Sequence, residues 1–153
     1  MEMKKIAFIN DHLGQGGVGG VTKMLALEMF EMGHDVTCVT IKTKESVPNV
    51  HNKFLNITRL QRYLVLPLIL KLWRFFKSHH FDYVISSKDF VNIWVILAFK
   101  LANPEDSKII VNSHNNVEET DQQLPCGFQK ISLKLSKLFY RHADFVANVS
   151  LKA

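Results

Sequence analysis

The sequence is poor in the residues that form disulfide frameworks and zinc sites. Its 153 residues include two cysteines, Cys38 and Cys126, whose number and spacing fit neither kind of site. Cys38 lies in an apolar segment, so we expect it to be a small core residue. Nothing in the cysteine usage indicates an oxidising compartment.

The sequence also lacks an uncharged apolar run of the roughly 20 residues that a membrane-spanning helix needs. The charged start, 1–5, leads directly into a strand-like segment, so we expect no secretory signal peptide and a cytoplasmic protein. With 47% hydrophobic and 22% charged residues, the composition is that of a globular protein. The length suits one domain with a substantial core.

Acidic residues are missing from the segment 46–81, in which the net charge of +5 is concentrated. Its basic residues are Lys53, Arg59, Arg62, Lys71, Arg74 and Lys77. Within it, 60–79 predicts an apolar helix interrupted at Pro67, because proline cannot continue the helical hydrogen bonding.

The basic residues of this predicted helix fall within about half of its circumference, and Trp73 suits an interfacial position. This pattern is typical of a helix on an anionic membrane surface. The membrane-contact candidates are Arg59, Arg62, Lys71, Trp73, Arg74 and Lys77. The alternative is a helix that packs on a sheet and has a solvated basic face. Because no aromatic platform or known motif accompanies the charge, we expect no nucleic-acid partner.

Strand-like and helix-like segments alternate along the chain. The predicted strands are 6–10, 36–41, 54–57, 83–86, 109–112 and 145–149, and the predicted helices are 21–32, 60–79, 89–101 and 128–142. Gly33 is expected to cap the first helix. This alternation predicts an α/β fold with a Rossmann-like, doubly wound, mainly parallel sheet and helices on both faces. Ligands of such sheets bind beyond the carboxyl ends of the strands, which predicts a site lined by 10–20, 42–44, 86–89, 114–119 and Ser150.

Glycine is scarce outside one cluster, because five of the seven glycines lie within 14–20. The cluster follows the first predicted strand and opens the first predicted helix. Glycine allows close approach of an anion to the backbone, and a helix N-terminus supplies free N–H donors. The cluster therefore predicts a phosphate-binding loop.

Two familiar phosphate loops match the cluster only in part. Gly14, Gly16 and Gly19 satisfy the dinucleotide fingerprint, but Lys42 and Lys44 follow the second strand where that fingerprint has an acid. The two lysines leave open an oxidoreductase domain that binds NADP. A P-loop ATPase fits poorly, since Gly20 and Val21 occupy the positions of its catalytic lysine and its magnesium-binding hydroxyl.

A third pattern covers nearly the whole chain. Its pieces are Gly16–Val18, then Gly33–Thr37, 81–87, Ile109–His114 and 142–150. In this order and spacing they resemble the amino-terminal half of glycosyltransferase family 4. The resemblance implies a GT-B enzyme with two Rossmann-like domains and its active site between them. We therefore expect 1–153 to be the single acceptor-side domain, without the carboxyl-terminal nucleotide-sugar domain and inactive alone.

The resemblance implies transfer of a sugar, with retention of configuration, from a nucleotide-sugar donor to a lipid-linked glycan acceptor. Such enzymes act in cell-surface polysaccharide synthesis, including lipopolysaccharide and capsule, and the resemblance implies no metal or cofactor. A peripheral position on the inner face of the cell membrane would follow. A non-catalytic membrane-binding module is the other alternative.

Site roles follow from the same resemblance. It implies that Gly16, Gly17 and the Val18 backbone contact the donor diphosphate, and that His114 contacts the donor sugar without acting as a nucleophile. The acceptor candidates are Glu118, Glu119 and His12. A solvated loop is the alternative explanation for the two glutamates.

Overall fold

A computed structural model describes residues 1–14, 17–56, 65–87, 89–113 and 138–148. The strands are β1 (Lys5–Asn10), β2 (Asp35–Thr40), β3 (His51–Phe54), β4 (Tyr83–Ser86), β5 (Lys108–Ser113) and β6 (Phe145–Asn148). The helices are α1 (Gly17–Glu31), α2 (Val65–Ser78) and α3 (Asp89–Ala102). The strands form one sheet of order β3-β2-β1-β4-β5-β6, in which every pairing is parallel. The predicted doubly wound Rossmann-like sheet is confirmed.

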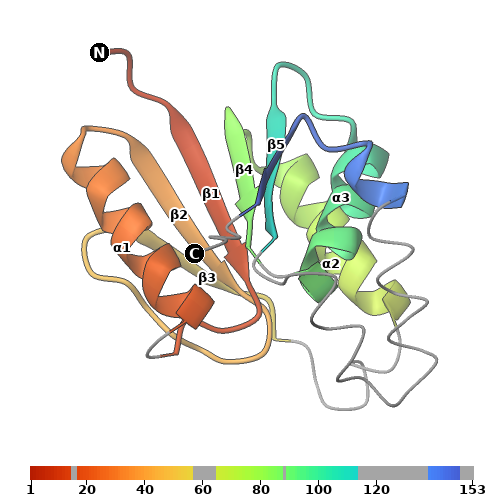
Figure 1. The fold of residues 1–153 in the computed structure, drawn as a ribbon, viewed down its shortest axis with the longest axis horizontal. Helices are drawn as coiled ribbons and strands as arrows, with labels where there is room; N and C mark the ends of the chain where they lie inside the picture. The colour runs from red at the N-terminus through yellow and green to blue at the C-terminus, as the bar shows by residue number, and fades with distance from the viewer. Residues whose placement is uncertain (15–16, 57–64, 88, 114–137, 149–153) are drawn as a thin grey trace.

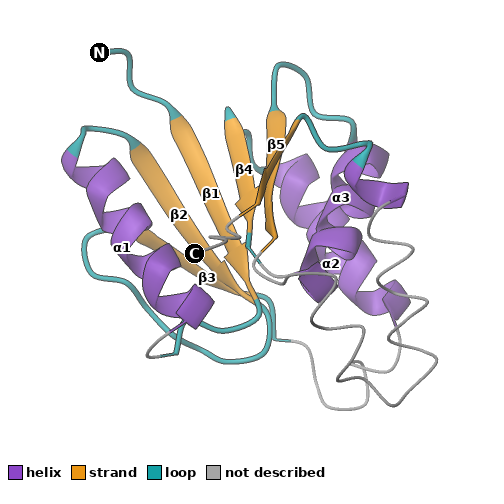
Figure 2. Ribbon diagram, viewed as in Figure 1, coloured by secondary structure: helices purple, strands orange, loops and turns teal. Residues whose placement is uncertain are grey.

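The sheet lies between two helical layers, with α1 on one face and α2 and α3 on the other (Figures 1 and 2). Side chains of β1 alternate between these layers, as a central strand requires. Ile6 and Phe8 join the core beneath α1, whereas Ala7 and Ile9 join the core beneath α2 and α3. The strand is apolar on both faces because helices cover both faces.

The first helix ends as the sequence predicts. Gly33 has a φ of 92°, its N–H donates to Phe30 O at 2.9 Å, and the N–H of His34 donates to Met29 O at 3.1 Å. These two bonds form a Schellman motif, which uses glycine because an L side chain disfavours a positive φ. The helix begins at Gly17, four residues before the predicted start at residue 21.

Two predicted elements differ from the structure. The third strand is His51–Phe54 and not 54–57, because β3 is an edge strand with exposed polar residues that an apolar pattern does not detect. Pro67 does not interrupt α2, because it lies in the first turn, where an N–H has no helical partner. The expected helix 128–142 lies mostly outside the described residues, as does the part of the second helix before residue 65.

Cys38 lies in β2 and is a buried core residue, as expected. Burial raises the pKa of its thiol to about 12, so the reactive thiolate is scarce at neutral pH. Across the described residues, no helix is both long and apolar enough to cross a membrane.

Aspartates fix the register of the sheet at its amino end. Asp82 immediately precedes β4 and accepts a 2.7 Å hydrogen bond from the N–H of Lys5, the first residue of β1. Asp144 precedes β6 and accepts a 2.8 Å bond from the N–H of Ile109 in β5. Each carboxylate thus joins the start of its own strand to the neighbouring strand. This gives a structural role to the aspartate–apolar segments that carry part of the family resemblance.

Replacing Asp82 by alanine is expected to lower the free energy of unfolding by about 1 kcal/mol, because the N–H of Lys5 loses a charged acceptor. For a domain of this size that corresponds to a fall in melting temperature of about 2–4 °C. Thermal and urea unfolding measure it. Glu105→Ala, a change at an exposed acid in a turn, is the control. Equal stability of the two variants would contradict the register role.

Candidate functional site at the carboxyl edge of the sheet

Buried polar side chains gather at one edge of the sheet. In the part of the chain that the structure describes they are Asn10, Asp11, Thr22, Thr40, Ser86, Ser87, Asn92 and Ser113. All lie at the carboxyl ends of β1, β2, β4 and β5, in the first two turns of α1 or in the first turn of α3. The remainder of the core is apolar. The chain after β1 and the chain after β4 turn to opposite faces of the sheet, which makes this edge the topological switch point of the fold.

Several of these polar groups have no hydrogen-bond partner among the described residues. Asn10 Oδ1, Thr40 Oγ1 and Ser86 Oγ are buried and unsatisfied at the ends of three adjacent strands. Asn92 Oδ1, in the first turn of α3, is a fourth such atom. Buried polar atoms are normally paired, so their concentration here indicates water or ligand groups at this edge.

The first turn of α1 lies tightly against the loop that follows β1. A Cβ on Gly19 would lie 2.8 Å from Gly14 O and 3.0 Å from the carbonyl carbon of Leu13, and both of these are backbone atoms. Gly17 has a φ of 55°, which also favours glycine, whereas a Cβ on Gly20 would meet nothing within 4 Å. Gly17 and Gly19 are therefore required by backbone geometry, and Gly20 is not.

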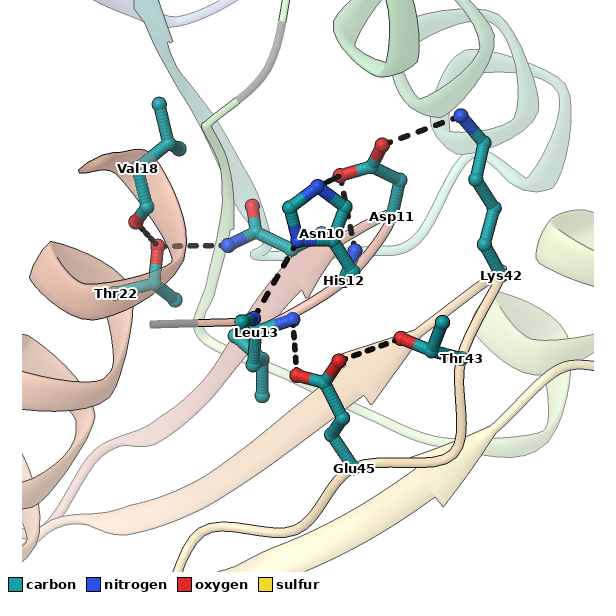
Figure 3. A network of polar contacts seen from close by, with 10 residues as sticks. Asn10, Asp11, His12, Leu13, Val18, Thr22, Lys42, Thr43 and Glu45 are labelled. Carbon is teal, nitrogen blue, oxygen red and sulfur yellow. Dashed lines mark hydrogen bonds and ion pairs between the residues drawn. The ribbon is translucent and has the colours of Figure 1, made fainter. Parts of the chain in front are cut away.

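A side-chain bridge joins the end of β1, through the second turn of α1, to the carbonyl of Val18 in the first turn (Figure 3). Asn10 Nδ2 donates to Thr22 Oγ1 at 2.8 Å, and the Thr22 hydroxyl donates to Val18 O at 2.9 Å. Because both side chains are buried, the bridge holds the N-terminus of α1 at the carboxyl edge. The first four N–H groups of a helix have no intrahelical acceptor, so those of Gly17 to Gly20 could donate to an anion, with the positive end of the helix dipole behind them.

The loop between β1 and α1 carries a buried acid beside a lysine from the end of β2. Asp11 accepts the N–H of His12 at 2.9 Å and lies 3.3 Å from Lys42 Nζ. The backbone joins them too, since the N–H of Lys42 donates to Asp11 O at 2.8 Å. The Asp11 side chain is 3% exposed and that of Lys42 is 35% exposed, so the lysine shields the acid from the surface.

Three successive N–H groups of this loop are taken by acceptors from the chain itself (Figure 3). Asp11 accepts from His12, Glu45 Oε2 accepts from Leu13 at 2.5 Å, and His12 Nδ1 accepts from Gly14 at 3.4 Å. Among the described residues of this loop, the N–H groups of residues 12–14 are therefore already paired within the chain.

The structure describes only part of the predicted site. Gly17 and Val18 lie in the first turn of α1, and His12 lies beside it with a side chain that is 47% exposed. The other predicted residues, Gly16, His114, Glu118 and Glu119, lie outside the described residues.

Of the membrane-contact candidates, too, the structure describes only some. Arg74 and Lys77 are exposed on α2, next to the exposed Leu70, while Trp73 packs partly buried against the core. Lys71 Nζ donates to the backbone carbonyls of Leu55 and Asn56 at 2.9 and 2.7 Å, which fixes the end of β3. Arg59 and Arg62 lie outside the described residues.

The fold is that of a Rossmann-like domain, with buried polar side chains and the N-terminus of α1 at its switch point. The family model of Glycosyltransferase Family 4 matches residues 15–152, so the chain belongs to glycosyltransferase family 4. Sucrose-phosphate synthase from Thermosynechococcus elongatus has a similar structure, with a TM-score of 0.70 at 15% sequence identity. The match covers 94% of this chain and 41% of the synthase, so the chain spans less than half of that protein. A search of curated proteins finds no significant match.

Sequence reasoning missed part of the network around the loop. Topology placed Asn10, Asp11 and Lys42 among the lining residues, because they follow the strands directly. The lining segment predicted after the second strand was 42–44, which ends one residue before Glu45. The only signal for Glu45 is a polar acid just past a strand end, which is common in solvated loops.

The two neighbouring glycines of α1 predict opposite effects on stability. Gly19→Ala should destabilise the fold by about 1–3 kcal/mol, the usual cost of overpacking, since its Cβ would press on backbone that cannot rotate away. Gly20→Ala should stabilise it by up to about 1 kcal/mol, because alanine favours helix and the space is open. Urea unfolding compares the two. A neutral Gly19→Ala would refute the close approach.

Proposed function

We propose that the chain is the acceptor-side domain of a retaining glycosyltransferase, which transfers a sugar from a nucleotide-sugar donor to a lipid-linked glycan acceptor. The observation that supports this most is the first turn of α1, which turns its N–H groups onto the switch-point edge in a member of glycosyltransferase family 4. In this proposal Gly17 and Val18, with Gly16, contact the donor diphosphate. Hydrogen bonds to phosphate oxygens at a helix N-terminus are favourable and need no cation.

In this proposal a second domain completes the binding site for the donor. The chain spans 41% of the synthase that shares its fold. A second Rossmann-like domain would bind the nucleotide across the cleft, and the unsatisfied atoms of Asn10, Thr40 and Ser86 would line the near wall. The chain alone would then bind the donor weakly, since it supplies the diphosphate contacts and not those to the base.

The alternative of an NADP-binding oxidoreductase is less well supported by the loop. A dinucleotide fold uses the N–H groups just after the first strand for the pyrophosphate. Here those of His12, Leu13 and Gly14 are already bonded within the chain. Lys42, which could suit a 2′-phosphate, is paired with Asp11.

Sugar transfer tests the proposal in the protein that carries both domains. We expect transfer of radiolabelled sugar from a nucleotide-sugar donor to extracted membrane lipids, and a loss of at least tenfold in kcat for His114→Ala if His114 contacts the donor sugar. His142→Ala, at an exposed histidine in a turn, is the control. Tight NADPH binding together with no transfer from UDP- or GDP-sugars would contradict the proposal.

We further propose that α2 contacts an anionic membrane through its exposed basic and apolar residues. Arg74 and Lys77 are exposed near its carboxyl end, and Leu66 and Leu70 are 67% and 43% exposed closer to its start. Exposed leucines beside basic side chains suit the boundary between headgroups and acyl chains.

Reversing both charges, Arg74→Glu with Lys77→Glu, should reduce binding to vesicles that contain phosphatidylserine by about tenfold or more. Each basic residue near such a surface contributes about 1 kcal/mol. Lys44→Glu with Lys53→Glu gives the same change in net charge at exposed residues outside α2 and is the control. Vesicle sedimentation measures the binding. Equal loss in both double variants would show that only net charge matters.

A further inference from the structure

We infer that Glu45 is a positioning residue, which sets the place of the α1 donors although it lies outside the glycine loop. The inference deepens the proposed function and depends on it for the role of the donors. Glu45 follows β2, 32 positions after Leu13, and its two carboxylate oxygens have different tasks (Figure 3). Oε2 accepts the N–H of Leu13 at 2.5 Å, and Oε1 accepts the Thr43 hydroxyl at 2.7 Å.

The backbone around Glu45 is itself fixed on both sides. Before it, the N–H groups of Ile41 and Lys42 donate to the carbonyls of Asn10, the last residue of β1, and of Asp11, which follows it. After it, Val47 is 2% exposed in the core beneath α1 and is hydrogen-bonded through its N–H and its carbonyl to the Asn52 side chain of β3. The carboxylate therefore extends from a firm segment of the fold.

Glu45 does not need to contact α1 directly, because Leu13 and Gly14 lie between them. Glu45 fixes the N–H of Leu13, and the Leu13 side chain is buried at 1% exposure beneath α1. The same two residues are the backbone against which Gly19 packs, with 2.8 Å between its notional Cβ and Gly14 O. A shift of the loop would therefore displace the first turn of α1 and the N–H groups that it presents.

The sign of the effect on anion binding separates positioning from simple electrostatics. Glu45 is negative, so as a bare charge near an anion site it would weaken binding, and its removal would strengthen binding. As a positioning residue it has the opposite effect, because its loss disorders the donors. Glutamine keeps a carbonyl oxygen for the N–H of Leu13 and removes the charge.

The test titrates the 15N-labelled chain with inorganic pyrophosphate and follows the amides of Gly17 to Gly20 by NMR. We expect Glu45→Ala to raise the Kd by up to about tenfold, because the energy of one charged hydrogen bond limits how much its loss can weaken the binding. Glu45→Gln should bind at least as tightly as the original chain. Glu31→Ala, at an exposed acid in the last turn of α1, should change nothing. Equal or tighter binding by Glu45→Ala would overturn the inference.

The ligand-free chain gives a second, independent measurement. Glu45→Ala should accelerate hydrogen exchange of the Leu13 amide and shift the Gly19 and Gly20 amide resonances, while Glu45→Gln should leave both nearly unchanged. If the original chain does not bind pyrophosphate, the proposed donor site fails, but these resonances still decide the positioning role. Unshifted Gly19 and Gly20 amides in Glu45→Ala would overturn it.

Discussion

The approach of the first turn of α1 to the backbone of Leu13 and Gly14 is the contact on which the site depends. It exists because residue 19 has no side chain. From it follow the direction of the helix N-terminus, the bridge from Asn10 through Thr22, and the place of the donors at the edge of the sheet. A bulkier residue there would separate helix and loop, and the same N–H groups would then face solvent instead of the switch point.

The two ends of the sheet differ in how their polar groups are paired. At the amino end, the Asp82 and Asp144 carboxylates accept from the N–H groups of Lys5 and Ile109, near the starts of the neighbouring strands. At the carboxyl end, buried atoms of Asn10, Thr40 and Ser86 have no hydrogen-bond partner within the described part of the chain. Such atoms destabilise a fold, because each was removed from water without a replacement partner. The concentration of these atoms at the carboxyl edge fits a surface where a bound ligand supplies the missing hydrogen bonds. The amino edge instead fixes the register of the strands.

The sequence predicts the fold well because its signals are local and strong. Each of these signals depends on a few neighbouring residues. Examples are the apolar run of β1, the helix cap Gly33 and the alternation of strands and helices. An apolar pattern does not predict the edge strand β3, since its polar residues face solvent. The prediction at Pro67 was wrong because the effect of a proline depends on where the helix begins. The carboxyl edge follows from topology. Glu45 does not, because its partner Leu13 becomes a neighbour only through the tertiary fold.

The most direct test of the central claim is a crystal structure of the protein with bound inorganic pyrophosphate. This ligand is the part common to nucleotide-sugar donors, so the test does not require the sugar or the base to be known. We expect phosphate oxygens within hydrogen-bond distance of the N–H groups in the first turn of α1. Pyrophosphate bound instead at the N–H groups of His12 and Leu13, with the Glu45 carboxylate displaced, would contradict it.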